Sequence, residues 1–190
     1  MREPFYLCTR LHSSTIISGV NVNFNSIVVV SGALAALAAL IVALVTYLQL
    51  KHSRFALGVD LILQLETSFG SAEMKAERNR AANALKGNAN LADLEPVLDF
   101  FETVGVLVRR QAIDEELAWS SFSYWVLRYA ALAREQIHAR RKLDSDDTYY
   151  QDFDFLVEYL TQVEMKKRRL KSPPFFPADS LASFLEEEKG

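Results

Sequence analysis

Residues 27–50 read IVVVSGALAALAALIVALVTYLQL, and this apolar run decides the fold of the chain. From Ile27 to Leu48 it contains twenty-two residues. As a helix they span about 33 Å, enough to cross a hydrocarbon core of about 30 Å. A buried core helix and a cleaved signal peptide are the alternatives, but the run is longer than either typically contains and lacks a small-residue cleavage site at its end. We therefore expect a transmembrane helix over residues 27–50.

The charges beside this run predict its orientation. No Asp, Glu, Lys or Arg occurs from Leu11 to Leu50, whereas Lys51 and Arg54 follow the apolar run directly. Lys and Arg near the end of a span favour the cytoplasmic side of the membrane. We therefore expect residues 1–26 to be a short extracytoplasmic segment and the C-terminal part of the chain to be cytoplasmic.

Composition narrows the function of the part after the span. The formal net charge of the 190-residue chain is −3, and acidic residues outnumber basic ones after residue 50. This balance argues against a general nucleic-acid binder. Cys8 is the single cysteine, and the three histidines are scattered at positions 12, 52 and 138. We therefore expect no intramolecular disulfide, no metal site and no cofactor.

Apolar residues at spacings of three and four predict an all-α fold, with one N-terminal transmembrane helix and a cytoplasmic bundle of about five helices over residues 51–172. The expected helices are 54–67, continuing from the span as a stalk, 72–86, 93–110 with Asp93 as its cap, 114–143, and one from 147 to the basic residues at 166–171. Three prolines then interrupt the chain, so residues 173–190 should be a Pro/aromatic linker with a short amphipathic tail helix over 180–188.

Two features of the helix over residues 93–110 carry further expectations. Gly105 stands mid-helix, where glycine is unfavourable, so another helix should approach closely there. Asp99 and Glu102 are one turn apart and share a face. Paired carboxylates can serve acid–base or metal chemistry, but structural ion pairs are the favoured interpretation, with partners among Arg109, Arg110 and Arg128.

A longer stretch carries a family resemblance. Residues 99–116 read DFFETVGVLVRRQAIDEE, and residues 121–129 read SFSYWVLRY, in which we expect Trp125 and Tyr129 to be core residues. Together with the preceding span, this region resembles an uncharacterised bacterial family of small single-span membrane proteins with a domain of unknown function. The resemblance implies an α-helical cytoplasmic domain anchored in the bacterial inner membrane, and it brings no established activity.

Arg134 and His138 are the candidate catalytic pair. All-helical ribonucleases of the HEPN class carry Arg and His on one helix, separated by a longer gap than the three residues found here. The two residues still share one helix face. A membrane-bound accessory protein of RNA-targeting CRISPR systems is similar in having one span and a HEPN-like domain. The favoured interpretation is nevertheless a solvated helix surface, because no second acid or base is evident nearby in the sequence.

A dense basic cluster is the candidate surface patch, comprising Lys166, Lys167, Arg168, Arg169 and Lys171. Cations suit the C-terminal end of a helix, so a solvated helix end is the first interpretation. Because Phe175 and Phe176 follow closely, anionic lipid is the second interpretation and RNA phosphate the third. Nucleic acid is thus a less favoured partner than the lipid bilayer.

A stripe of small residues in the span, formed by Gly32, Ala36, Ala39 and Ala43, favours self-association of the chain. Taken together, these patterns predict a membrane-anchored helical interaction or regulatory protein, with an unidentified protein partner and no catalytic role. The alternatives are a HEPN-like membrane-bound ribonuclease or accessory protein of phage defence, and an oligomeric pore-forming effector.

Overall fold

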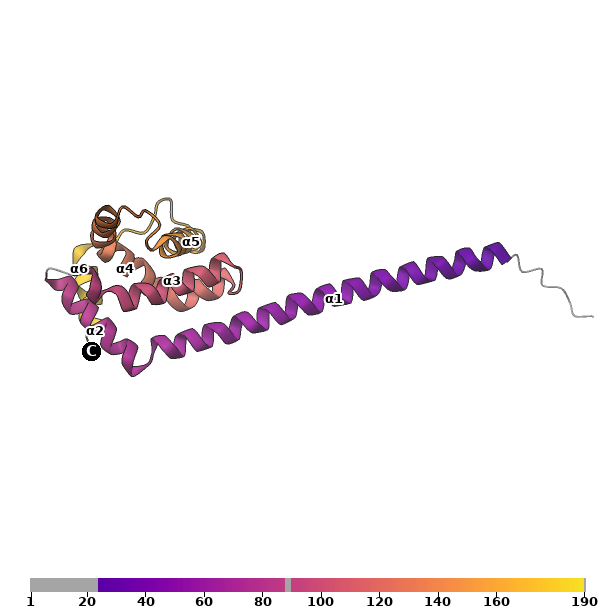
Figure 1. Cartoon of the computed structure of the whole chain (residues 1–190), viewed down its shortest axis with the longest axis horizontal. Coiled ribbons are helices and arrows are strands. Elements are labelled where there is room, and N and C mark those ends of the chain that lie inside the picture. The colour runs from indigo at the N-terminus through magenta and orange to yellow at the C-terminus, as the bar shows by residue number, and fades with distance from the viewer. Residues whose placement is uncertain (1–23, 88–89, 190) are drawn as a thin grey trace, which may run out of the picture. The chain divides into compact units, whose positions relative to one another are not determined.

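The computed structural model of the chain describes residues 24–87 and 90–189. Most of the expected extracytoplasmic segment over residues 1–26, including Cys8, lies outside these residues. The described residues form α-helices and one short 3-10 helix and contain no strand, in agreement with the predicted all-α fold (Figure 1). The chain divides into two compact units, Met1–Tyr47 and Leu48–Gly190.

Helix α1 runs from Phe24 to Phe69, so the expected span and the expected stalk are one continuous helix. Its part from Leu34 onward is long and apolar enough to cross a membrane, with a mean hydropathy of 2.0 in its most apolar window and none of that window buried. The large apolar side chains of this part of α1 are correspondingly exposed. Leu40 is 68% exposed and Val42 is 65% exposed.

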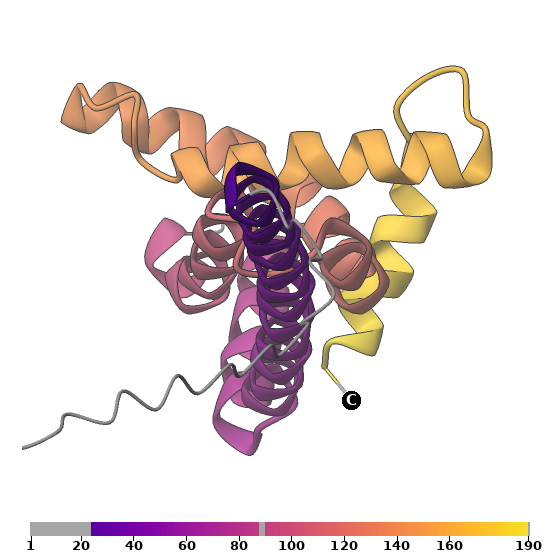
Figure 2. The same cartoon turned by 90° about the vertical axis from the view of Figure 1, so that its right-hand side faces the viewer.

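Five helices follow α1 in the described part of the second unit: α2 (Ala72–Lys86), α3 (Glu95–Arg109), α4 (Glu115–Asp144), α5 (Gln151–Arg168) and α6 (Ala178–Glu187). A 3-10 helix, η1 (Leu91–Asp93), precedes α3. Helix α5 packs against α3 and α4, and α6 returns to contact α2 and α4 (Figures 1 and 2). The tail helix is therefore part of the folded domain.

Local hydrogen bonds explain most of these helix boundaries. Ser71 caps α2 by accepting a bond from the Met74 amide at 3.1 Å, and Asp114 caps α4 by accepting one from the Glu116 amide at 2.9 Å. The expectation that Asp93 caps α3 is wrong. Asp93 belongs to η1, and α3 begins after Leu94 without a side-chain cap.

The core of the second unit is largely aromatic. Phe69, the last residue of α1, lies with its ring centre 5.0 Å from that of Phe100 and 5.2 Å from that of Trp125. Phe101 and Tyr129, which are fully buried, continue the cluster toward α5. Trp125 is partly buried at the edge of this core. Burial of Phe69 thus fastens the end of α1 into the helical domain.

Candidate functional site

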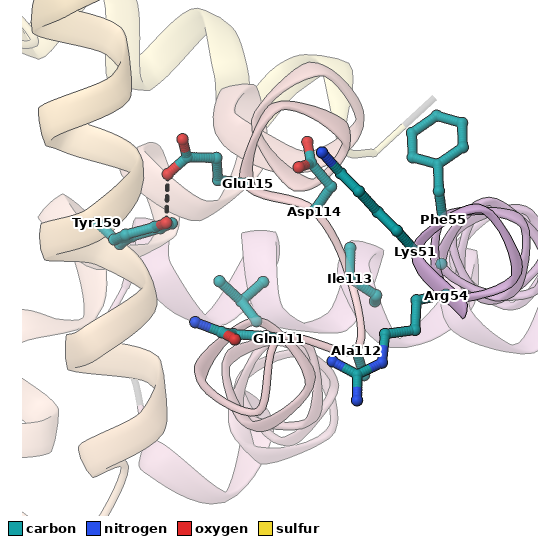
Figure 3. Close-up of a pocket in the computed structure, with 11 residues that line it drawn as sticks. Lys51, Arg54, Phe55, Gln111, Ala112, Ile113, Asp114, Glu115 and Tyr159 are labelled. Atoms are coloured by element: carbon teal, nitrogen blue, oxygen red, sulfur yellow. Dashed lines mark hydrogen bonds between the residues drawn. The ribbon is translucent and has the colours of Figure 1, made fainter. Parts of the chain in front are cut away.

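A pocket of about 350 Å³ lies between the Lys51–Gly58 segment of α1, the turn between α3 and α4, and Tyr159 of α5 (Figure 3). All of its lining residues belong to the second unit. Its volume is within the range of small-molecule sites. Sequence reasoning missed this pocket because its walls come from three elements that only the fold brings together.

The floor of the pocket is the turn at residues 111–114. Gln111 has a positive φ of 55°, and its amide bonds back to the Val108 carbonyl at 2.9 Å, so the chain turns sharply after α3. Ile113 is buried and anchors the turn to the core. A Cβ at Gly58 would lie 3.1 Å from the Ala112 carbonyl oxygen. The glycine therefore lets α1 approach the turn closely.

Charges of both signs line this pocket. Lys51 and Arg54 project from α1, and Asp114 and Glu115 project from the start of α4 (Figure 3). Within residues 24–87 and 90–189, neither cation has a carboxylate at ion-pair distance. The pocket therefore contains two cations that form no ion pair in the described part of the domain.

The two carboxylates are held in place by their own neighbours. Asp114 Oδ1 accepts the Glu116 amide at 2.9 Å, and Glu115 Oε2 accepts the Tyr159 hydroxyl. The hydrogen bond to Glu115, followed by burial, raises the pKa of Tyr159 to about 12. Tyr159 therefore remains a neutral donor at physiological pH and fixes the Glu115 side chain at the pocket wall.

The candidate catalytic residues Arg134 and His138 share a different, smaller cleft. Both are exposed on α4, and together with Arg141 and with Asp154 of α5 they line a space of about 120 Å³. Arg141 donates to the Tyr149 carbonyl at 2.9 and 2.6 Å and to Asp154 at 2.6 Å. Arg141 thus helps to hold α5 against α4.

The residues of the candidate basic patch differ in their contacts, since two of them form ion pairs with glutamates of the domain. Lys167 pairs with Glu116 of α4 at 2.9 Å and lies 5.5 Å from the Trp119 ring centre, while Arg168 pairs with the buried Glu164 at 2.6 Å. The Lys167 contact lowers the pKa of Glu116.

The other three members of the patch are Lys166, Arg169 and Lys171. Among the described residues, none of these three forms an ion pair.

The small residues of the candidate packing stripe, Gly32, Ala36, Ala39 and Ala43, are all exposed along α1. A Cβ at Gly32 would meet no atom within 4 Å in the described part of the chain. Within the described part of one chain, the stripe is therefore exposed. Self-association through it stays a prediction.

The acidic pair on α3 has structural roles, as expected, but not with the expected partners. Asp99 accepts the Tyr150 hydroxyl at 2.9 Å. Glu102 accepts the backbone amides of Asp152, at 3.2 Å, and Phe153, and so caps the first turn of α5. Arg109 pairs instead with Asp152 at 2.7 Å. The arginine partners predicted for this pair were therefore wrong, because backbone amides and a tyrosine hydroxyl satisfy it.

A buried network around Glu188 at the end of α6 was also missed. Its carboxylate accepts the Tyr129 hydroxyl at 2.9 Å and the Trp125 indole N–H at 3.1 Å, and it lies 3.2 Å from Arg78 Nε. Burial is the main cause that raises the pKa of Tyr129 well above its ordinary value. The amphipathic pattern of the tail was the only sequence signal that α6 would dock.

The chain belongs to the family of a domain of unknown function, DUF4760, whose model matches residues 33–160, more than half of the chain. The matched region contains every residue that lines the pocket, together with Arg134 and His138, but it ends before the basic patch and α6. No curated protein and no solved structure matches the chain. The family therefore identifies the domain without assigning it an activity.

Proposed function

We propose that the chain is a membrane-anchored helical protein that acts through interaction or regulation. In this proposal α1 crosses the bilayer and α2–α6 lie on the cytoplasmic side. The observation that carries it is the apolar window of α1, none of which is buried although its mean hydropathy is 2.0. A bilayer would cover this surface, whereas water would solvate it at high cost.

The connection between span and domain supports a role at the membrane surface. Gly58 of α1, eight residues after Leu50, lies so close to the turn after α3 that an added Cβ would stand 3.1 Å from the Ala112 carbonyl oxygen. Eight helical residues extend about 12 Å. A domain fastened so close to the end of the span has little freedom to leave the headgroup region. A partner or ligand would therefore meet this domain at the membrane surface.

An interaction role is favoured over catalysis because structural contacts occupy the most conspicuous acidic groups. Glu102 caps α5, and Glu188 holds α6 in the domain. Both carboxylates already accept two hydrogen bonds from the protein itself. Affinity purification of the tagged full chain from membranes tests this role, with the isolated span carrying the same tag as control. A partner that is recovered only with the helical domain is the expected result.

Membrane integration is tested by fractionation and alkaline carbonate extraction. The full chain should remain in the membrane pellet, and the double variant Leu40→Arg, Val42→Arg should be released, because each central arginine opposes insertion by about 2.5–3.5 kcal/mol. The double variant Leu40→Ala, Val42→Ala is the matched control and should stay in the pellet. Release of the unaltered chain by carbonate would contradict the proposal.

Orientation is tested separately with reporters fused after Gly190. Because Lys51 and Arg54 follow the apolar run, a reporter that works only in the cytoplasm should be active. Alkaline phosphatase, which works only outside the cytoplasm, should be inactive at the same position. The double variant Lys51→Glu, Arg54→Glu should weaken this bias. Phosphatase activity in the unaltered fusion would reverse the proposed orientation.

A further inference from the structure

We propose that the pocket between α1 and the turn at residues 111–114 binds a phospholipid headgroup that carries both a phosphate and a primary amine, as phosphatidylethanolamine does. Lys51 and Arg54 would hold the phosphate, and Asp114 and Glu115 would hold the ammonium group. This inference rests on the proposed membrane anchoring and names a ligand for the same surface of the protein.

The charges of the pocket favour a zwitterion over a simple ion. Its lining contains two cations on α1 and two carboxylates at the start of α4, with Lys51 extending toward Asp114 (Figure 3). An anion alone would meet the two carboxylates, and a cation alone would meet Lys51 and Arg54. A headgroup that carries charges of both signs has a partner for both kinds of group in the lining. Electrostatic complementarity of this kind confers specificity.

Each carboxylate is oriented and keeps an oxygen for the ligand. Asp114 accepts the Glu116 amide through Oδ1, and Glu115 accepts the Tyr159 hydroxyl through Oε2. Across the described part of the chain, Asp114 Oδ2 and Glu115 Oε1 receive no hydrogen bond, so both remain available as acceptors. A primary ammonium group has three donors and can use both oxygens, as a lysine ammonium can. A quaternary choline group has no N–H donor and cannot.

The position of the pocket along α1 suits a lipid. Its first lining residue, Lys51, directly follows Leu50, where the apolar run ends. Leu48 and Leu50 are about half exposed, at 54% and 53%. Acyl chains could therefore lie along these residues while the headgroup enters the pocket. A soluble phosphate ester would gain nothing from this apolar surface, so lipid is the proposed source of the headgroup.

The proposal is tested by microscale thermophoresis with the full chain purified in a maltoside detergent. The probes are dihexanoyl-phosphatidylethanolamine, its phosphatidylcholine and phosphatidylglycerol counterparts, and soluble O-phosphoethanolamine. The ethanolamine lipid should bind at least about fivefold more tightly than each of the other three probes, a difference of about 1 kcal/mol. Equal affinity for the three lipids would overturn the proposal. Equal affinity for O-phosphoethanolamine would overturn lipid as the source.

Two double variants test the cations and the carboxylates of the pocket separately. Lys51→Gln with Arg54→Gln should weaken binding of the ethanolamine lipid by about tenfold. Asp114→Asn with Glu115→Gln keeps side-chain oxygens that can serve as the cap and as the acceptor for Tyr159, so folding should survive. This pair should lose the preference for ethanolamine over glycerol headgroups. Circular dichroism checks the fold of each variant.

Lys142→Gln with Glu135→Gln is the matched control, because both residues are exposed on α4 outside the pocket. It should bind all probes as the unaltered chain does. If both pocket pairs bind the lipids unchanged, the inference is wrong. Carbonate extraction keeps this outcome apart from the proposed anchoring, since a chain that stays in the membrane pellet but shows no headgroup preference contradicts only the lipid site.

Discussion

Gly105 of α3 lies directly against the backbone of Asp152 at the start of α5. A Cβ at Gly105 would stand only 2.2 Å from the Asp152 carbonyl oxygen. The expectation that another helix approaches at this glycine is therefore confirmed, and the partner is α5. Arg109, one turn further along α3, pairs with the Asp152 side chain at 2.7 Å and reinforces the same crossing.

Gly105→Ala should destabilise the domain by about 1–3 kcal/mol, because the added methyl group forces the two helices apart. The better helix propensity of alanine, worth about 1 kcal/mol, offsets only part of this cost. Chemical denaturation of the full chain in mild detergent, followed by circular dichroism, measures the change. Gly32→Ala is the control, since its Cβ would meet nothing within 4 Å in the described structure. Equal stability of the two variants would contradict the close contact.

Glu102→Ala should cost about 1–2 kcal/mol, because it removes the side chain that caps α5 across the interface with α3. Tyr150, the residue before α5, has a positive φ of 59° and makes no side-chain cap, so no local group replaces Glu102. The loss should appear as a lower denaturation midpoint. Thr103→Ala is a neighbouring control on the exposed side of α3, and it should change stability by less than about 0.5 kcal/mol.

The same glutamate should make stability depend on pH. Burial raises the pKa of Glu102 above its ordinary value of 4.5, although the bonds from the Phe153 and Asp152 amides oppose this shift. The folded protein then binds this proton more tightly than the unfolded chain does. The contribution of Glu102 is therefore greatest below pH 4.5 and declines as the pH rises through the folded pKa. Glu102→Gln has no such proton, so its stability relative to the unaltered chain should improve from about pH 4 to 7. A constant difference would refute the raised pKa.

Glu188→Ala should destabilise the domain by about 3 kcal/mol, because it leaves the Trp125 indole and the buried Tyr129 hydroxyl without their shared acceptor and Arg78 without its ion-pair partner. Release of α6 should also make the C-terminal tail sensitive to limited proteolysis. Glu187→Ala is the adjacent control. Glu187 accepts only the exposed Tyr124 hydroxyl among its described contacts, so its loss should cost less than about 1 kcal/mol. Similar proteolysis of the two variants would show that Glu188 does not hold α6.

The features that sequence could predict are those encoded by nearby residues. The break at residues 69–71 and the extent of α2 followed from Gly70, Gly87 and the helical spacing between them. The start of α5 could not be predicted in this way, because Tyr150 has a left-handed backbone and the cap comes from Glu102, about fifty residues earlier. The pocket escaped prediction for the same reason. Lys51, Asp114 and Tyr159 are distant in sequence and are brought together only by packing.

Arg134→Ala and His138→Ala decide between an interaction domain and a ribonuclease. Both residues are exposed, and Arg141 beside them is occupied by the Tyr149 carbonyl and Asp154. We expect each substitution to change stability by less than about 0.5 kcal/mol and to leave any cellular phenotype intact. A phosphoryl-transfer site would behave differently, because loss of either the proton-transfer group or the charge that stabilises the transition state reduces the rate strongly. Cleavage of RNA by the purified full chain, lost in both variants while each stays folded, would overturn the non-enzymatic interpretation.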